Sequence, residues 1–177
     1  MNKLNKKFLD IILRYAILAL FAIGGLWIFY FIFTPLTIYP IYFIFNLFFN
    51  TFIDGTTIYT KNFPIEIIKA CVAGSAYYLL LIFNLSTPEI KFKQRFKMIF
   101  FAFLIFLIVN IIRIFILSLL YINNSSLFEM MHILSWYAGS VLFVILIWFI
   151  QVKLNKIREI PVYSDLKFLY KYSLFKK

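Results

Sequence analysis

The stretch from Met98 to Tyr121, MIFFAFLIFLIVNIIRIFILSLLY, decides the class of this protein. Apart from Asn110 and Arg113 it is almost wholly apolar, and it exceeds the roughly 20 residues that a helix needs to cross a bilayer. The whole chain has the same character, because 64% of its 177 residues are hydrophobic and its mean hydropathy is +0.93. Soluble domains are about half apolar. The sequence therefore predicts an all-α, polytopic membrane helix bundle that forms one domain over residues 1–177.

Three other runs are predicted to cross the membrane: residues 15–33, about 62–83, and 127–150. The first run could instead be a signal peptide, but its apolar part is long and no small-residue cleavage site follows it. Asn62, Pro64 and Glu66 provide the start of the second helix. Ser126 and Glu129 form a Ser-x-x-Glu capping box at the start of the last one.

Residues 37–52 are apolar but short, and Pro35 and Pro40 flank or interrupt their beginning. We expect a short interfacial or re-entrant helix here, although a short crossing is the alternative. The prediction is thus four full spans plus this one short helix. Asp54 to Asn62 is expected to form a turn and an extended polar segment.

The distribution of basic residues predicts the topology. The net charge is +11, but the basic residues lie in short clusters between apolar runs, which is typical of topology signals rather than of a nucleic-acid-binding surface. Residues 1–14, 84–97 and 151–177 are strongly basic, whereas loops 54–64 and 122–126 are not. The positive-inside rule places the first three in the cytoplasm. A multi-pass protein of the cell membrane with both termini cytoplasmic is expected, its basic tail 151–177 lying on the membrane surface.

Three side chains within the apolar runs are candidates for a site. Cys71 is the only cysteine, His132 is the only histidine, and Arg113 is a charge inside a predicted span. At about 1.5 Å per residue, they lie roughly 10 Å, 6 Å and 12 Å below the outer ends of their predicted helices. All three are therefore expected at similar depth in the outer half of the bilayer.

Each candidate also has a structural explanation. A lone cysteine commonly acts as a small buried hydrophobic residue, and His132 could be a packed neutral histidine. Arg113 is the strongest candidate, because a guanidinium at this depth costs about 2.5–3.5 kcal/mol even on lenient insertion scales. Asn110, on the same helix face, could hold Arg113 in place, and Glu129 could orient the His132 ring.

Together the three residue types match one chemistry. A thiolate is a nucleophile, an imidazole transfers protons, and a cation stabilises an oxyanion. A metal site is not expected, because one cysteine and one histidine fall short of a normal ligand set, and no other cofactor is predicted.

The segments Ala70-Cys-Val-Ala-Gly-Ser-Ala76 and Asn110-Ile-Ile-Arg-Ile114, followed by His132, resemble those of the exosortase/archaeosortase family. The similarity covers about residues 60–150 and looks closest to the short archaeal members. These are membrane-embedded cysteine transpeptidases. The resemblance implies that Cys71 is the nucleophile, Arg113 the transition-state stabiliser and His132 the acid/base.

The resemblance also implies a substrate class. Substrates would be secreted proteins that end in a short motif, a transmembrane helix and a basic cluster. The enzyme would cut at the motif on the outer face and pass the new C-terminus to a membrane-linked acceptor, such as a lipid. The alternative is a non-catalytic membrane scaffold or transport subunit, in which Arg113 is a structural or ion-path charge.

Overall fold

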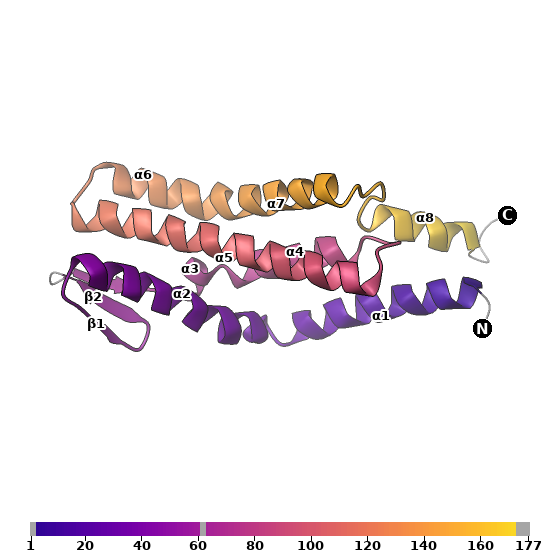
Figure 1. Ribbon diagram of the computed structural model, residues 1–177, viewed down its shortest axis with the longest axis horizontal. Helices are drawn as coiled ribbons and strands as arrows, with labels where there is room; N and C mark the ends of the chain where they lie inside the picture. Colours follow the sequence, from indigo (N-terminus) through magenta and orange to yellow (C-terminus); the bar gives the residue numbers. More distant parts are fainter. Residues whose placement is uncertain (1–2, 61–62, 173–177) are drawn as a thin grey trace.

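The computed structural model describes residues 3–60 and 63–172, which form an elongated helical bundle with a small sheet at one end (Figure 1). The helices are α1 (Lys3–Ile23), α2 (Trp27–Phe48), α3 (Lys69–Val72), α4 (Gly74–Leu85), α5 (Phe92–Ile122), α6 (Leu127–Leu134), α7 (Ser140–Leu154) and α8 (Tyr163–Tyr172). A π-helical segment, η1 (Ser135–Gly139), joins α6 to α7, and the strands are β1 (Thr51–Asp54), β2 (Thr57–Thr60) and β3 (Phe63–Glu66). The prediction of a mainly helical protein is confirmed.

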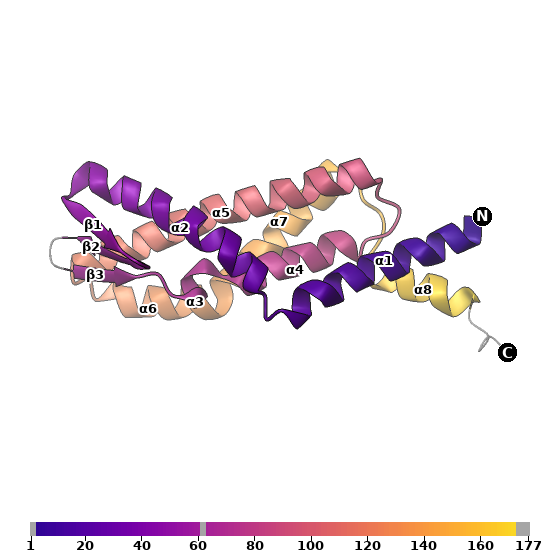
Figure 2. The same ribbon diagram turned by 90° about the horizontal axis from the view of Figure 1, so that it is seen from below.

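The chain runs back and forth along the long axis of the bundle. Helices α1 and α2 lead to the sheet, α3 and α4 lead back, α5 returns to the sheet end, and α6 to α7 leads away again (Figures 1 and 2). Among the described residues, α2 and α5 are long and apolar enough to cross a membrane, and the apolar segments 69–85 and 140–154 are shorter. The structure thus supports two candidate spans, not the four predicted ones.

The predicted boundaries in the first third of the chain are wrong. Helix α1 ends at Ile23, inside the predicted span, because Gly25 (φ 59°) and Leu26 (φ 61°) adopt left-handed conformations that end a helix. Helix α2 then continues through both Pro35 and Pro40, so no separate short helix exists over residues 37–52.

Helix α2 remains intact across its prolines because one face is packed along its whole length. Phe29, Phe33, Ile41 and Phe45 are each at most 6% exposed. The packing compensates for the hydrogen bonds that a proline removes, as neighbouring helices do in membrane proteins.

Strands β1, β2 and β3 form an antiparallel sheet in that order. The turn and extended segment predicted after Asp54 correspond to the turn at residues 55–56 and strand β2, whereas the sheet itself was not predicted. Ile58 pairs with Ile65, and both are buried on the inner face of the sheet, whereas Pro64 and Glu66 are exposed on alternate positions of β3. This period of two is that of a half-buried strand. The predicted helix start at Pro64 and Glu66 is therefore wrong, and Asn62 lies outside the described residues. The helix begins at Lys69 instead.

The core between α2, α4 and α5 is aromatic. Tyr77 is fully buried, and its ring stacks on Phe33 with a centroid distance of 3.6 Å. Phe103 and Phe106 meet Tyr77 edge-on. This cluster fixes α4 against α5, and with them the segments that carry Cys71 and Arg113.

A buried ion pair fastens the tail at the opposite end of the bundle. Two guanidinium nitrogens of Arg14 on α1 donate to the two carboxylate oxygens of Asp165 on α8, each at 2.8 Å. Arg14 Nη1 also donates to the carbonyl oxygen of Leu85, at 2.7 Å. Helix α8 is thus docked on the bundle through a buried carboxylate, a contact that was not predicted for the basic tail.

The three basic segments lie at the same end of the molecule. Lys7 of α1 pairs with Glu89 of the α4–α5 loop at 3.1 Å, and the backbone N–H of Val162 in the tail donates to the carbonyl of Ser86. The sheet and the α5–α6 loop lie at the far end (Figure 1). This arrangement agrees with the prediction that the basic segments share one side.

Candidate functional site

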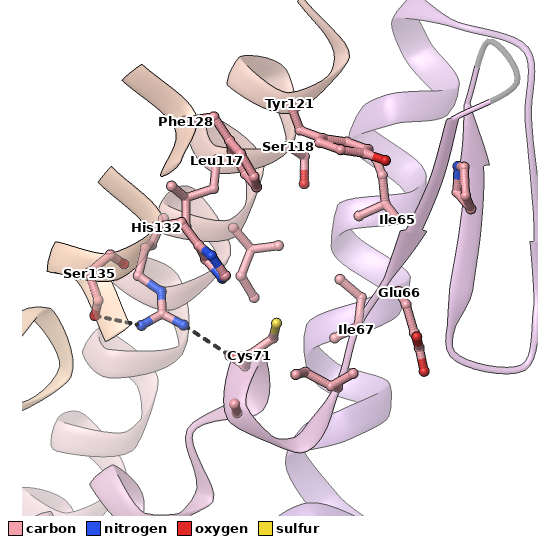
Figure 3. Close-up of a pocket in the computed structure, with 15 residues that line it drawn as sticks. Ile65, Glu66, Ile67, Cys71, Leu117, Ser118, Tyr121, Phe128, His132 and Ser135 are labelled. Carbon is pink, nitrogen blue, oxygen red and sulfur yellow. Dashed lines mark hydrogen bonds between the residues drawn. The ribbon is translucent and has the colours of Figure 1, made fainter. Parts of the chain in front are cut away.

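A cavity of about 270 Å³ lies near the sheet end of the bundle. One wall is formed by β3 and the segment that leads to α3, and the other by α5, α6 and the first residue of η1. Cys71, Arg113 and His132 all line this cavity, although their three segments are far apart in the sequence. The side chains of Cys71 and His132 both point into it (Figure 3).

Cys71 is held on a one-turn helix rather than within a long one. Its backbone N–H donates to the carbonyl of Ile68 at 2.9 Å, and α3 ends at Val72, just before Ala73, whose φ of 57° is left-handed. Helix α4 starts again at Gly74. Cys71 is therefore two residues after the start of its helix, so the predicted distance of roughly 10 Å between Cys71 and the outer end of its helix is wrong. Its thiol is free and partly buried.

Two side chains of α5 hold the main chain at Cys71. Asn110, only 2% exposed, donates from Nδ2 to the carbonyl oxygen of Cys71 at 2.9 Å. Arg113 donates from Nη2 to the same oxygen at 3.4 Å. The sequence predicted that Asn110 would hold Arg113. Instead, both side chains share one acceptor, so that the position of Cys71 depends on α5.

Arg113 also connects α5 to the start of η1 and α7. Its Nη1 lies 3.4 Å from the carbonyl oxygen of Ser135 and 3.4 Å from the hydroxyl of Ser140. These are long, weak hydrogen bonds. Among the described residues Arg113 forms no ion pair, so its charge is not neutralised by a carboxylate.

Two buried polar atoms at the cavity lack a hydrogen-bond partner within the described part of the chain: Arg113 Nε and Ser135 Oγ. Both residues line the cavity. Buried polar groups are almost always paired, so each such exception calls for an explanation. Ser135 is the first residue of η1. Its place at the start of a π-helical segment, which is a frequent feature of functional sites, could not be read from the sequence.

His132 lies on α6, one turn after Phe128, and its ring stacks on the Phe128 ring at 5.4 Å with an interplanar angle of 7°. Glu129, the predicted orienting residue, is exposed and is not among the residues that line the cavity. The structure therefore places Cys71, Arg113, His132 and Asn110 at one site and leaves Glu129 outside it.

The predicted capping box of α6 is also wrong. Ser126 has helical backbone angles (φ −60°, ψ −18°) and forms no side-chain cap hydrogen bond. An N-cap residue needs a non-helical backbone to direct its oxygen at the first N–H groups. The hydroxyl of Ser125 accepts the N–H of Leu127 instead, at 3.3 Å.

Comparison with protein-family models, with curated proteins and with solved structures gives no match. The function is therefore argued from the site itself.

Proposed function

We propose that this protein is a membrane-embedded cysteine peptidase or transpeptidase with Cys71 as nucleophile. One observation carries the proposal: the sole cysteine, the sole histidine and an arginine without an ion pair among the described residues line one cavity. Each of the three belongs to a different segment, and burying Arg113 in an apolar bundle is costly. Reactive and titratable side chains that gather in one cavity are typical of a functional site.

The reaction would begin with proton transfer from the Cys71 thiol to His132. The thiolate attacks the carbonyl carbon of the scissile peptide bond, and the negative charge moves to the carbonyl oxygen. Arg113 stabilises this oxyanion through its charge, and its Nε–H has no hydrogen-bond partner among the described residues.

Collapse of this intermediate breaks the peptide C–N bond. His132 returns the proton to the leaving amine, and Cys71 retains the acyl group as a thioester. An amine, a hydroxyl group or water then attacks the thioester carbonyl, the C–S bond breaks, and the thiol is regenerated. A membrane-linked acceptor gives transpeptidation, and water gives hydrolysis.

The substrate class follows from the family resemblance and from the placement of the cavity. The cavity lies toward the sheet end, away from the basic segments, which by the positive-inside rule is the outer side of the membrane. Secreted proteins with a C-terminal motif, a transmembrane helix and a basic cluster would present the motif on the same side of the membrane as the cavity. The protein would then act in the cell membrane with both termini in the cytoplasm.

The test is processing of such a co-expressed secreted protein. Cys71→Ala and Cys71→Ser should both abolish processing, and the wild type should accumulate an acyl adduct on Cys71 that hydroxylamine releases, as detected by mass spectrometry. Size-exclusion profiles of both variants control for folding. Full processing by Cys71→Ala would refute the proposal.

A second candidate function is a non-catalytic membrane scaffold or transport subunit. It is favoured by the hydrogen bonds of Arg113, which go to the carbonyls of Cys71 and Ser135 and to the Ser140 hydroxyl within the protein. Under this function Arg113→Gln lowers the thermal stability, while Cys71→Ala leaves every cellular phenotype of the protein unchanged. Under the first function Cys71→Ala is the more damaging variant.

A further inference from the structure

Within the part of the chain that the structure describes, strand β3 has a free edge, because it is the last strand in the order β1-β2-β3. The backbone N–H of Ile67 donates to the carbonyl of Thr56 at 2.9 Å. Hydrogen-bonded and non-hydrogen-bonded pairs alternate along an antiparallel ladder. The pairing of Ile65 with Ile58 is therefore hydrogen-bonded, and Glu66 and Pro64 direct their backbone groups away from β2.

Proline at position 64 supports this assignment independently. A proline lacks the N–H that a hydrogen-bonded pair requires, so it is found at edge positions. The free edge thus presents the carbonyl of Pro64, the N–H and carbonyl of Glu66, and the N–H of Ile68. Among the described residues no hydrogen bond is formed by any of these groups.

This edge borders the candidate site. Pro64, Glu66 and Ile68 line the same cavity as Cys71. The carboxylate of Glu66 points away from the Cys71 thiol (Figure 3). Glu66 therefore contributes its backbone groups to the site rather than its side chain. The main chain of β3 then continues through Ile67 and Ile68 directly into α3.

We propose that the edge of β3 binds the substrate as an additional, extended strand and leads its scissile bond to Cys71. This inference rests on the proposed peptidase function and names how the substrate is recognised. Main-chain N–H and C=O groups at every second residue are matched by the backbone of an extended peptide. A lipid acyl chain has no groups to pair with them, and unpaired groups are costly in an apolar setting.

The cavity wall opposite β3 fits the side chains of such a peptide. Leu117, Tyr121 and Phe128 line it, and Ile65 adds an apolar side chain from β3 itself. Successive side chains of an extended peptide point to opposite sides, so alternate residues would face this wall. We therefore expect a preference for apolar residues at every second position of the substrate.

The experiment measures alkylation of Cys71 by mass spectrometry, with the full chain in lipid nanodiscs. The probe is a capped apolar tripeptide chloromethyl ketone, and its rate is divided by the rate with iodoacetamide, which has no peptide backbone. Glu66→Pro removes the edge N–H, whereas the matched variant Glu66→Ala removes the carboxylate and keeps the N–H. The ratio should be about 3- to 10-fold lower for Glu66→Pro than for Glu66→Ala, the effect of one hydrogen bond.

A second measurement avoids any change in the protein. Tripeptide reagents that carry one N-methyl group at successive backbone amides are compared on the wild type. Reagents methylated at every second amide should alkylate Cys71 more slowly, by a factor similar to that of Glu66→Pro. The inference would be overturned if Glu66→Pro and Glu66→Ala gave equal rate ratios and the N-methylated reagents showed no alternation in rate. It would also be overturned if Glu66→Pro dissociated a dimer, because the edge of β3 would then pair with a second copy of the chain.

These outcomes are separate from failure of the proposed function. The iodoacetamide rate reports activation of the thiol, and it should fall in Arg113→Gln if Arg113 supports the thiolate. An unchanged rate in Arg113→Gln would count against the catalytic role of Arg113, whereas the rate ratio reports only on the edge of β3.

Discussion

Replacing Asp165 by asparagine should release helix α8 from the bundle. Asp165 accepts two hydrogen bonds of 2.8 Å from Arg14, and the two side chains are only 1% and 4% exposed. Loss of one partner of a buried ion pair costs about 3–5 kcal/mol, because the other charge is left buried. Arg14 keeps its bonds to Asp10 and to the Leu85 carbonyl, so we expect the lower value, about 3 kcal/mol.

The same guanidinium provides a matched control. Asp10 also accepts a hydrogen bond from Arg14, at 2.9 Å, but its side chain is 55% exposed. Exposed pairs of this kind contribute about 0.3–0.5 kcal/mol. Asp10→Asn should therefore change the population of undocked α8 by about twofold, whereas Asp165→Asn should raise it roughly a hundredfold.

The assay is trypsin cleavage after Lys167 and Lys171, which are exposed on α8 but protected by its helical backbone. When opening and closing are fast, the cleavage rate follows the open population. Equal cleavage rates in Asp10→Asn and Asp165→Asn would refute the conclusion that the buried pair holds α8.

Two further predictions concern packing and topology. Gly74→Ala should destabilise the protein by about 1–3 kcal/mol, because the new Cβ would lie 2.8 Å from the Tyr30 ring. Adding Tyr30→Leu should recover most of the loss in thermal stability, and equal melting temperatures for the single and double variants would contradict this explanation. In a background without the native cysteine, Ser126→Cys should react in intact cells with a membrane-impermeant maleimide, whereas Lys93→Cys should react only after lysis. The opposite result would place the cavity on the cytoplasmic side.

The helical character of the protein and the helix over 98–121 could be predicted because an apolar run of this length has few other structures available. Helix α5 begins earlier, at Phe92, inside the basic segment that was predicted as a linker. The sequence also selected Cys71, Arg113 and His132, since each is an unusual residue in an apolar setting. Their arrangement around one cavity, however, depends on strand β3, the one-turn helix α3 and the π-helical segment η1, which were not predicted.

The sheet and the position of α2 could not be predicted for physical reasons. The three strands alternate between more and less buried positions, but each strand is only four residues long, too short for a clear period of two. Pro35 and Pro40 indicate a helix boundary by local propensity, and tertiary packing of α2 overrides that preference. The break at Ala73 has no sequence signal, because alanine is usually a helix-forming residue.

The ion pair between Arg14 and Asp165 also sets an order of events during synthesis. The two residues are 151 positions apart in the sequence. At about 5–20 residues per second, α1 is made roughly 8–30 s before the carboxylate that it needs. During that interval the remaining partners of Arg14 among the described residues are Asp10 and the Leu85 carbonyl, and the second of these also follows it in the chain. The pair that fastens α8 to α1 therefore forms only when the last described helix has been made.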